Sequence, residues 1–141
     1  MSAEMLQKAI EIAVDGHKGQ VDKNDELYIL HPMRVMGAFR DDARRIVGIL
    51  HDVVEDTRYE TVDLANLGFP DEIRDAVDAI TKRDGEPYND YLSRILANEI
   101  ARDVKLADIK DNSSRLDRVS EPDRSRLQKK YATALGFLKR T

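Results

Sequence analysis

The segment from Asp42 to Thr57, DARRIVGILHDVVEDT, constrains the fold of this chain more than any other. Its apolar residues nearly encircle a helix, a pattern typical of a helix that is buried on most sides. These residues are Ile46, Val47, Ile49, Leu50, Val53 and Val54. The same segment contains His51, Asp52, Glu55 and Asp56, and burying charged groups without partners is costly. We therefore expect a buried helix whose polar residues are compensated by a cation or a polar network.

Helical spacing divides these four polar residues into two pairs. Glu55 lies four residues after His51 and Asp56 four residues after Asp52, so each pair shares one face of the helix. Acidic residues near a helix C-terminus oppose the helix dipole, which favours a functional role for Glu55 and Asp56 over a solvated acidic end. For His51 the alternative is a core histidine with a satisfied hydrogen bond. The pattern predicts that this helix carries part of a metal site in a small hydrolase.

Composition restricts the class of protein to which the chain can belong. Its 141 residues fit one domain, and the net charge of -4 argues against a general nucleic-acid-binding surface, while leaving room for a local basic pocket. The absence of cysteine excludes disulfides, thiolate metal ligands and a cysteine nucleophile. No apolar run approaches about eighteen residues and no signal peptide is recognisable, so we expect a cytoplasmic protein that neither spans a membrane nor is exported.

The rest of the chain predicts an all-α fold, a single helical bundle of about seven or eight helices without sustained strand alternation. Ser2 is a candidate N-cap for the first helix, Asp41 and Asp42 for the central helix, and Asn98 for a later one. The polar stretch 19–28 predicts a loop. The predicted helices run from about 3 to 16 or 17, from 31–32 onward, over 42–57, over 61–67, from 70 to near 85, from 87 onward, from 98 through 108, and from 122 onward.

Two further histidines are candidates for the site. His31 stands between the predicted loop and the helix that Pro32 opens, and it is either an N-cap-like polar residue or a second imidazole ligand held by the stiff proline. His17 has no comparable partner, and we interpret it as a histidine favoured by the dipole at a helix C-terminus or as a residue behind the ligands. Because the chain has only three histidines, two in such settings are informative.

A carboxylate continues an inward-facing row in the segment 101–112, ARDVKLADIKDN. Asp108 follows Val104 on one helical stripe, with Lys105 and Asn112 flanking it at helical spacing. Asp108 therefore points at a partner in the core or, in the alternative interpretation, faces water near the end of its helix.

The four candidate ligands would form a mixed nitrogen and oxygen site, which suits Mn, Fe, Co or Zn better than Ca or Mg. These ligands are His31, His51, Asp52 and Asp108. The two remaining acids of the central segment would be surplus to coordination, as a hydrolase requires. A metal lowers the pKa of bound water and polarises a phosphoryl oxygen, while a nearby carboxylate orients that water or moves its proton.

Taken together, three motifs resemble the HD-domain metal-dependent phosphohydrolases. They are most similar to the hydrolase domain of Rel/Spo alarmone enzymes and the stand-alone small alarmone hydrolases. The motifs are His31-Pro32, His51-Asp52-Val53-Val54-Glu55-Asp56, and Val104-Lys105-Leu106-Ala107-Asp108 with Asn112. The similarity extends over most of the chain, from His17 to Asn112, and implies that residues 1–141 form one HD phosphohydrolase domain without the synthetase and regulatory domains of long Rel enzymes.

The resemblance also implies a reaction and roles for individual residues. One divalent ion, usually manganese in this family, would be bound by the four ligands His31, His51, Asp52 and Asp108. Glu55 and Asp56 would be the catalytic acids that position and activate the attacking water, and the substrate-binding residues would be Lys23, Lys105 and Asn112. The reaction would remove pyrophosphate from the 3′ position of guanosine tetra- or pentaphosphate, leaving GDP or GTP. The partner is then a small phosphorylated nucleotide, with no nucleic acid or membrane, and no oligomeric state is predicted.

Two departures from the family's pattern affect substrate recognition. The loop before the first ligand histidine usually carries a basic pair but here reads Val21-Asp22-Lys23, and an aspartate cannot stack on a base as an arginine can. The usual His-Asn-Met-Arg-Thr-like run becomes Asp111-Asn112-Ser113-Ser114-Arg115. One alternative is therefore an HD phosphohydrolase acting on another nucleotide, such as an adenosine alarmone, a deoxynucleotide or NADPH. The other is a catalytically silent nucleotide-binding or interaction module, which would not require surplus acids beside a metal.

The last predicted helix carries a basic run, Arg124, Arg126, Lys129 and Lys130. We interpret this run as a solvated helix face, with phosphate binding as the alternative.

Overall fold

The computed structural model describes residues 3–139, so the predicted N-cap Ser2 lies outside the described residues. Over this range the chain forms nine α-helical segments and one 3-10 helix, with an isolated β-bridge between Val21 and Leu27 in the predicted loop. The segments are α1 Ala3–Gly16, α2 Leu30–Gly37, α3 Asp42–Leu50, α4 Val53–Asp56, α5 Thr61–Asn66, α6 Asp71–Ile80, α7 Tyr88–Leu96, α8 Glu99–Ser114, η1 Leu116–Arg118 and α9 Asp123–Leu138. The prediction of an all-α bundle is confirmed, and counting α3 and α4 as one interrupted helix gives eight helices.

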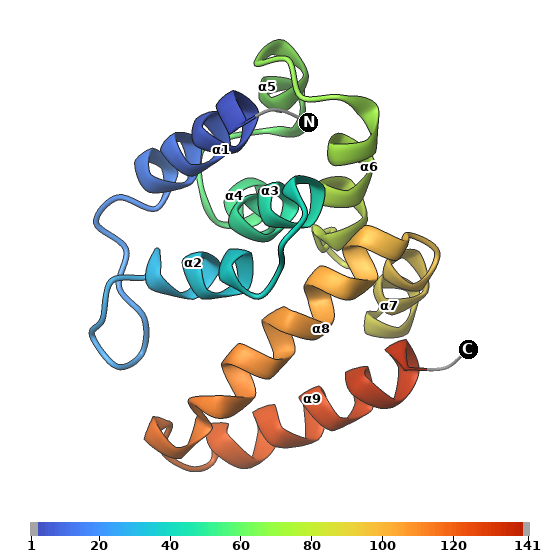
Figure 1. Ribbon diagram of the computed structural model, residues 1–141. Coiled ribbons are helices and arrows are strands. Elements are labelled where there is room, and N and C mark those ends of the chain that lie inside the picture. Colours follow the sequence, from blue (N-terminus) through green and yellow to red (C-terminus); the bar gives the residue numbers. More distant parts are fainter. Residues whose placement is uncertain (1–2, 140–141) are drawn as a thin grey trace.

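The helix α3 lies at the centre of the bundle, packed against α1, α2, α6 and α8 (Figure 1). The long helix α8 crosses the molecule, and α9 lies along its outer side and reaches α7. Segments far apart in sequence are therefore brought together where the end of α3, the start of α2 and the middle of α8 meet.

The central segment departs from the prediction of one continuous helix over 42–57. The helix α3 ends at Leu50, a turn follows at His51 and Asp52, and the four-residue α4 begins at Val53. Asp52 has φ -104° and ψ -1°, outside regular helical values, and Tyr28 donates a hydrogen bond of 2.5 Å to Asp52 Oδ2. The apolar pattern continues through the break, so the sequence pattern alone does not indicate it. Asp56 N still donates to Asp52 O over 2.9 Å, so Asp52 and Asp56 remain one helical turn apart.

Local signals account for several helix boundaries. Asp41 Oδ2 accepts a hydrogen bond of 3.0 Å from Arg44 N, and Asn98 Oδ1 accepts one of 3.0 Å from Ala101 N, as expected of N-caps. The helix α6, in contrast, ends at Ile80 rather than near Gly85, because Thr81 adopts an extended conformation with ψ 117°. Residues 81–87 therefore form a loop that the sequence assigned in part to a helix.

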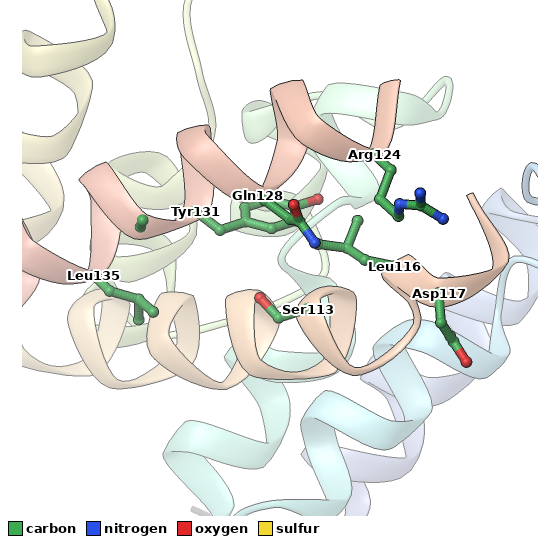
Figure 2. Close-up of a pocket in the computed structure, with 8 residues that line it drawn as sticks. Ser113, Leu116, Asp117, Arg124, Gln128, Tyr131 and Leu135 are labelled. Carbon is green, nitrogen blue, oxygen red and sulfur yellow. The ribbon is translucent and has the colours of Figure 1, made fainter. Parts of the chain in front are cut away.

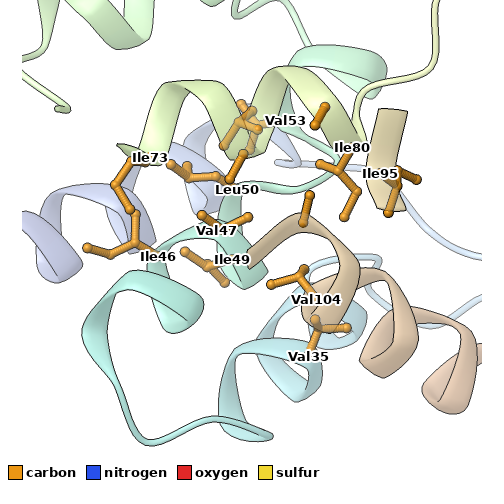
Figure 3. Packing of buried hydrophobic residues seen from close by; sticks show 14 of the residues in the cluster. Val35, Ile46, Val47, Ile49, Leu50, Val53, Ile73, Ile80, Ile95 and Val104 are labelled. Atoms are coloured by element: carbon orange, nitrogen blue, oxygen red, sulfur yellow. The ribbon is translucent and has the colours of Figure 1, made fainter. Parts of the chain in front are cut away.

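The hydrophobic core surrounds α3 on several sides (Figure 3). Ile46, Val47, Ile49 and Leu50 are all fully buried, which confirms that this part of the central segment is buried on most sides. Gly48 allows α2 to approach α3, because a Cβ at Gly48 would lie 3.2 Å from the backbone N and Cα of Met36. Tight packing of α2 on α3 thus depends on a residue without a side chain.

Among the described helices, none combines the length and the apolar character that crossing a membrane requires.

Candidate metal centre

Two helices and one turn supply the predicted ligands. His31 is the second residue of α2, His51 and Asp52 form the turn after α3, and Asp108 lies in the middle of α8. His31 is not an N-cap, since that position belongs to Ile29, and its imidazole faces inward instead. Asp108 is 5% exposed, so it does not face water at the end of its helix. The structure therefore rules out the N-cap alternative for His31 and the solvent-facing alternative for Asp108.

The four predicted ligands lie together. His31 Nε2 is 2.7 Å and His51 Nε2 is 3.2 Å from Asp108 Oδ1, and the two rings are 5.3 Å apart in an edge-on arrangement. Asp52 Oδ2 is 3.1 Å from His51 Nε2 and 3.9 Å from His31 Nε2. Ligand atoms bound about 2.0–2.2 Å from a small cation stand roughly 3–4 Å from one another, so this spacing is suitable for a metal ion.

The far side of each imidazole supports the same interpretation. His51 Nδ1 donates to Gly48 O over 2.6 Å, and His31 Nδ1 donates to Asp111 Oδ2 over 2.7 Å. A proton on Nδ1 leaves the Nε2 lone pair for a metal, and a carbonyl or carboxylate behind the ring holds it in that tautomer and orientation. The residues present therefore fit a divalent ion bound between the two Nε2 atoms and the carboxylates.

The electrostatics of the centre are those of a site built for positive charge. Burial alone would lower the pKa of His51, but the carboxylates of Asp52 and Asp108 raise it well above its ordinary value. Burial alone would raise the pKa of Asp108, but Lys105 and the two imidazoles hold it well below the usual range. Lys105 Nζ bonds Asp108 Oδ2 over 3.0 Å, on the carboxylate oxygen that the imidazoles leave free. Asp108 thus stays ionised and available as a ligand.

A second acidic group adjoins the ligands. Ligand atoms of Asp52, Glu55 and Asp56 all lie within 4.8 Å of one another, and Glu55 and Asp56 are exposed. Partial burial and the nearby Asp52 raise the pKa of both Glu55 and Asp56. Glu55 Oε1 is held by the backbone N–H of Lys82 over 2.9 Å. Asp52 therefore belongs to both clusters and joins the candidate ligands to two carboxylates that can take up a proton.

A cavity of about 380 Å³ opens next to the imidazole of His31. Its lining includes the predicted substrate residues Lys23 and Asn112, together with Arg115 and Tyr131. Asn112 also lies 3.4 Å from Asp108 Oδ1, which joins the cavity to the cluster. Another hollow, of about 570 Å³, lies between the end of α8, η1 and α9 (Figure 2) and shares Leu116 and Tyr131 with the first, but none of the predicted ligands or acids lines it. The cavity beside His31 is thus the one in a position to hold a substrate.

Comparison with known proteins identifies the domain. No family model matches the chain. A GTP pyrophosphokinase from Myxococcus xanthus is 31% identical over 144 residues, covering 88% of this chain and 19% of that protein. A guanosine-3′,5′-bis(diphosphate) 3′-pyrophosphohydrolase from Borreliella burgdorferi is 40% identical over 79 residues, covering 53% of this chain and 12% of that protein. A solved structure of a metazoan ortholog of SpoT matches 99% of this chain and 88% of its own with a TM-score of 0.84 and 20% identity. The chain contains an HD domain of the RelA/SpoT family. It spans less than a fifth of the length of the two curated relatives.

Within this HD domain, the predicted substrate residues occupy different surroundings. Lys105 is at the buried cluster and Asn112 at the rim of the cavity, whereas Lys23 is exposed and lies 3.7 Å from Asp123 Oδ2. Asp22, which replaces the expected basic residue, directs Oδ1 to the backbone N–H groups of Asn24 and Glu26 over 2.8 and 3.0 Å. The aspartate therefore stabilises its own loop, a role typical of aspartate in turns.

Sequence reasoning missed two residues that hold the candidate ligands in place. Tyr28 donates to Asp52 Oδ2, and Asp111 lies between His31 Nδ1 and Arg34 Nε, 2.7 Å from each. The sequence does contain a signal for Asp111. It lies three residues after Asp108 in α8, just as Arg34 lies three residues after His31 in α2. Residues three apart share a helical face, so the two helices can form two such contacts. For Tyr28, which lies outside any helix, the sequence offers no comparable signal.

His17 lies immediately after α1 and is 2% exposed, so it is not a solvated residue at the helix end. Its ring is 5.0 Å from the ring of Tyr28, and Nδ1 donates to Gln20 Oε1 over 2.9 Å. Gln20 in turn donates to Asp56 O over 2.8 Å. His17 therefore stands at the C-terminal end of α1 and also behind the residues of the site, so its position agrees with both interpretations of the sequence.

Proposed function

We propose that this HD domain is a metal-dependent nucleotide pyrophosphohydrolase that removes the 3′-pyrophosphate of guanosine tetra- or pentaphosphate to give GDP or GTP. The observation that carries the proposal is the position of Asp52, which groups with Glu55 and Asp56 and lies 3.1 Å from His51 in the group of two imidazoles and Asp108. A metal ion and a nearby carboxylate together favour hydrolysis of a phosphate ester, because the ion polarises the phosphoryl oxygen and the carboxylate acts on the attacking water. The names of the relatives, which include a 3′-pyrophosphohydrolase and a SpoT ortholog that hydrolyses ppGpp, support the same substrate class.

The proposed metal ligands are His31, His51, Asp52 and Asp108, and the proposed ion is Mn²⁺. A divalent ion at this position supplies Lewis-acid polarisation of a phosphoryl oxygen and lowers the pKa of a bound water. Mixed imidazole and carboxylate ligands accept manganese readily, while calcium and magnesium favour oxygen alone.

Glu55 and Asp56 are the proposed catalytic acids. Each has a raised pKa, so at neutral pH each is a stronger proton acceptor than an ordinary surface carboxylate. The N–H of Lys82 fixes one oxygen of Glu55 and leaves the other to orient the attacking water. A silent binding module would have no use for two such groups, so we do not favour that alternative.

Lys23, Lys105 and Asn112 are the proposed substrate-binding residues. The cavity beside His31 has room for a nucleoside, and Lys23, Arg34 and Arg115 bring positive charge to its wall. A nucleotide of this kind is a soluble cytoplasmic metabolite, consistent with the location expected from the sequence.

Another nucleotide remains the second candidate substrate because Asp22 stands where the family has a basic residue. Its carboxylate is engaged with the backbone of its own loop, so position 22 supplies no cationic side chain to stack on a base. Adenosine alarmones, deoxynucleotides and NADPH are the compounds to compare.

The test is incubation of the purified chain with Mn²⁺ and guanosine tetraphosphate, followed by separate assays for pyrophosphate and orthophosphate. We expect pyrophosphate and GDP in equal amounts, with no release in the presence of a chelator or from the Glu55→Ala variant. The same assay with the comparison nucleotides identifies the preferred base. If no nucleotide yields phosphate or pyrophosphate at high enzyme concentration, the proposed hydrolase activity is wrong.

A further inference from the structure

The basic run of the last helix is not a uniform solvated face. Arg126 is 3.2 Å from Asp123 Oδ1 and Arg124 is 3.9 Å from Glu121 Oε2, so each pairs with an acid of its own segment. Lys130 differs from both, because its Nζ lies 5.2 Å from the centre of the Tyr88 ring in α7. Lys130 therefore turns toward the bundle, whereas the two arginines are engaged at the start of α9.

Lys130 is one of several cations near the catalytic acids. Lys105 lies beside the same aromatic pair, with Nζ 5.5 Å from the centre of the Tyr91 ring, and the rings of Tyr88 and Tyr91 are 5.9 Å apart. Lys82 approaches from the loop after α6, where its backbone N–H holds Glu55. Lys105 and Lys130 therefore flank one pair of tyrosine rings, and Lys82 is fixed beside Glu55 by its backbone.

The charge in this group is not balanced by the protein. Within residues 3–139, neither the Lys82 nor the Lys130 ammonium has a carboxylate within ion-pair distance, and only Lys105 is paired, with Asp108. Partial desolvation lowers the pKa of Lys130, and the nearby cations Lys105, Arg126 and Lys82 lower it further. Like charges held together in this way are costly unless an anion binds among them.

The position of the lysines relative to the cavity indicates what that anion is. His31 and His51 contact Oδ1 of Asp108, and Lys105 contacts its other carboxylate oxygen, Oδ2. His31 also lines the nucleoside-sized cavity. A nucleotide with its nucleoside in the cavity and its scissile phosphorus at the cluster would therefore extend its remaining phosphate past Asp108 toward the lysines. Ammonium groups bind phosphate oxygens as point charges that adapt to the ligand.

We propose that Lys82 and Lys130, together with Lys105, form the binding site for the diphosphate group that the reaction releases. This inference rests on the proposed function and adds to it the residues that hold the leaving portion of the substrate. The inference assigns a role to Lys130 but none to Lys129, its neighbour in α9. Among the described residues, Lys129 has no ring contact or ion pair.

The test uses inorganic pyrophosphate as the probe and calorimetric titration of the full chain, both metal-loaded and stripped of metal. We expect Lys130→Gln and Lys82→Gln each to weaken pyrophosphate binding about tenfold, as the loss of one charge-assisted hydrogen bond does. Lys130→Arg should retain most of the affinity, and the matched control Lys129→Gln should bind as the wild type does. Orthophosphate, which is shorter and can reach fewer ammonium groups, should bind more weakly and discriminate less between the variants.

Equal pyrophosphate affinity in wild type, Lys82→Gln and Lys130→Gln would overturn the inference. A loss of affinity in Lys129→Gln as large as that in Lys130→Gln would also overturn it, since it would indicate only a general charge effect. This outcome differs from failure of the proposed function. If pyrophosphate binds through Lys130 but no nucleotide is hydrolysed, the anion site stands and the hydrolase proposal fails. If nucleotides are hydrolysed while the lysine variants bind pyrophosphate normally, only the inference drawn from the lysines fails.

Discussion

The candidate site has two halves of different construction, one carried by helices and one carried by loops. Side chains of the helix-borne half come from α2, α8 and the turn after α3, and His51 and Asp108 are almost completely buried. The loop-borne half consists of residues 19–29, with Asp22 and Lys23, and residues 81–87, with Lys82. Its side chains are mostly exposed and depend on hydrogen bonds rather than on core packing.

The difference shows how a site of this kind divides its tasks. A metal needs ligands held within a few tenths of an ångström, which packed helices and hydrogen bonds behind each imidazole provide. A substrate must enter and leave, which suits loops at the surface. Changes in the helix-borne half should therefore affect metal binding and the free energy of unfolding, and changes in the loop-borne half should affect mainly the affinity for substrate.

The largest effect is expected from Asp108→Ala. The change leaves Lys105 and two imidazoles without their buried carboxylate, and breaking such a network costs about 3–5 kcal/mol of unfolding free energy. We expect metal binding to be lost as well, measured by metal content and chemical unfolding. Asp103→Ala on the same helix removes only the surface pair with Arg44, so it should cost under about 1 kcal/mol and leave metal binding intact. Similar costs for the two variants would contradict the division into halves.

Glu55→Ala should separate chemistry from metal binding. Because Glu55 is exposed and belongs to the acidic group rather than to the buried ligands, the variant should retain its metal while turnover falls about 10²–10⁴-fold. Steady-state kinetics together with metal analysis provide the measurement, with the exposed Glu72→Ala as a control. Full activity in Glu55→Ala would show that the role assigned to this acid is wrong.

Gly48→Ala tests whether helix packing sets the ligand geometry. The added methyl group would meet the Met36 backbone at 3.2 Å, and overpacking of this kind costs about 1–3 kcal/mol. Because α2 also carries His31, we expect weaker metal binding along with a lower melting temperature. Gly37→Ala is the control, since nothing lies within 4 Å of its added carbon. Unchanged metal affinity in Gly48→Ala would mean that the approach of α2 to α3 does not position the ligand.

Asp22→Ala probes the first loop. It removes the acceptor for two backbone N–H groups, a loss of about 1 kcal/mol that is confined to the loop. Hydrogen exchange over residues 20–28 should rise and KM should increase a few-fold, while metal affinity stays the same. The Asp22→Asn variant retains an acceptor oxygen, so its exchange rates and KM should lie between those of the wild type and Asp22→Ala. A change in metal affinity would show that the two halves are coupled more closely than their contacts indicate.

The smallest effect is expected from Glu86→Gln, in the loop formed by residues 81–87. Arg94 binds both oxygens of Glu86 and the carbonyls of Asp78, Ala79 and Thr81, and this pairing lowers the pKa of Glu86 from 4.5 to about 2. Since the pKa is lower in the folded state, the stabilisation is present above pH 4.5 and is lost as the pH falls through about 2. Glu86→Gln should therefore melt slightly below the wild type at pH 7, with a difference that shrinks between pH 4 and 3. A difference that grows on acidification would contradict the assignment.

The sequence predicted the helix-borne half better than the loop-borne half, for physical reasons. Helical periodicity places Asp108 on the inward stripe of its helix, and capping residues such as Asn98 mark a boundary correctly, because both signals are local. The break at His51 and Asp52 could not be seen, because the apolar pattern runs straight through it and the Tyr28 hydroxyl that bonds Asp52 there is distant in sequence. The departure at Asp22 was interpreted through base recognition alone, and its bonds to Asn24 and Glu26 could not be seen, because they depend on how the loop turns. The separation of Lys130 from its basic neighbours likewise depends on Tyr88 in another helix.

The most direct test of the centre is a calorimetric titration of the metal-free chain with Mn²⁺, repeated for His31→Ala and His51→Ala. We expect one ion per wild-type chain and loss of binding in both variants, since the ligands come from separate helices and act on one ion. Binding of Mn²⁺ with unchanged stoichiometry and affinity in either variant would contradict a shared metal centre.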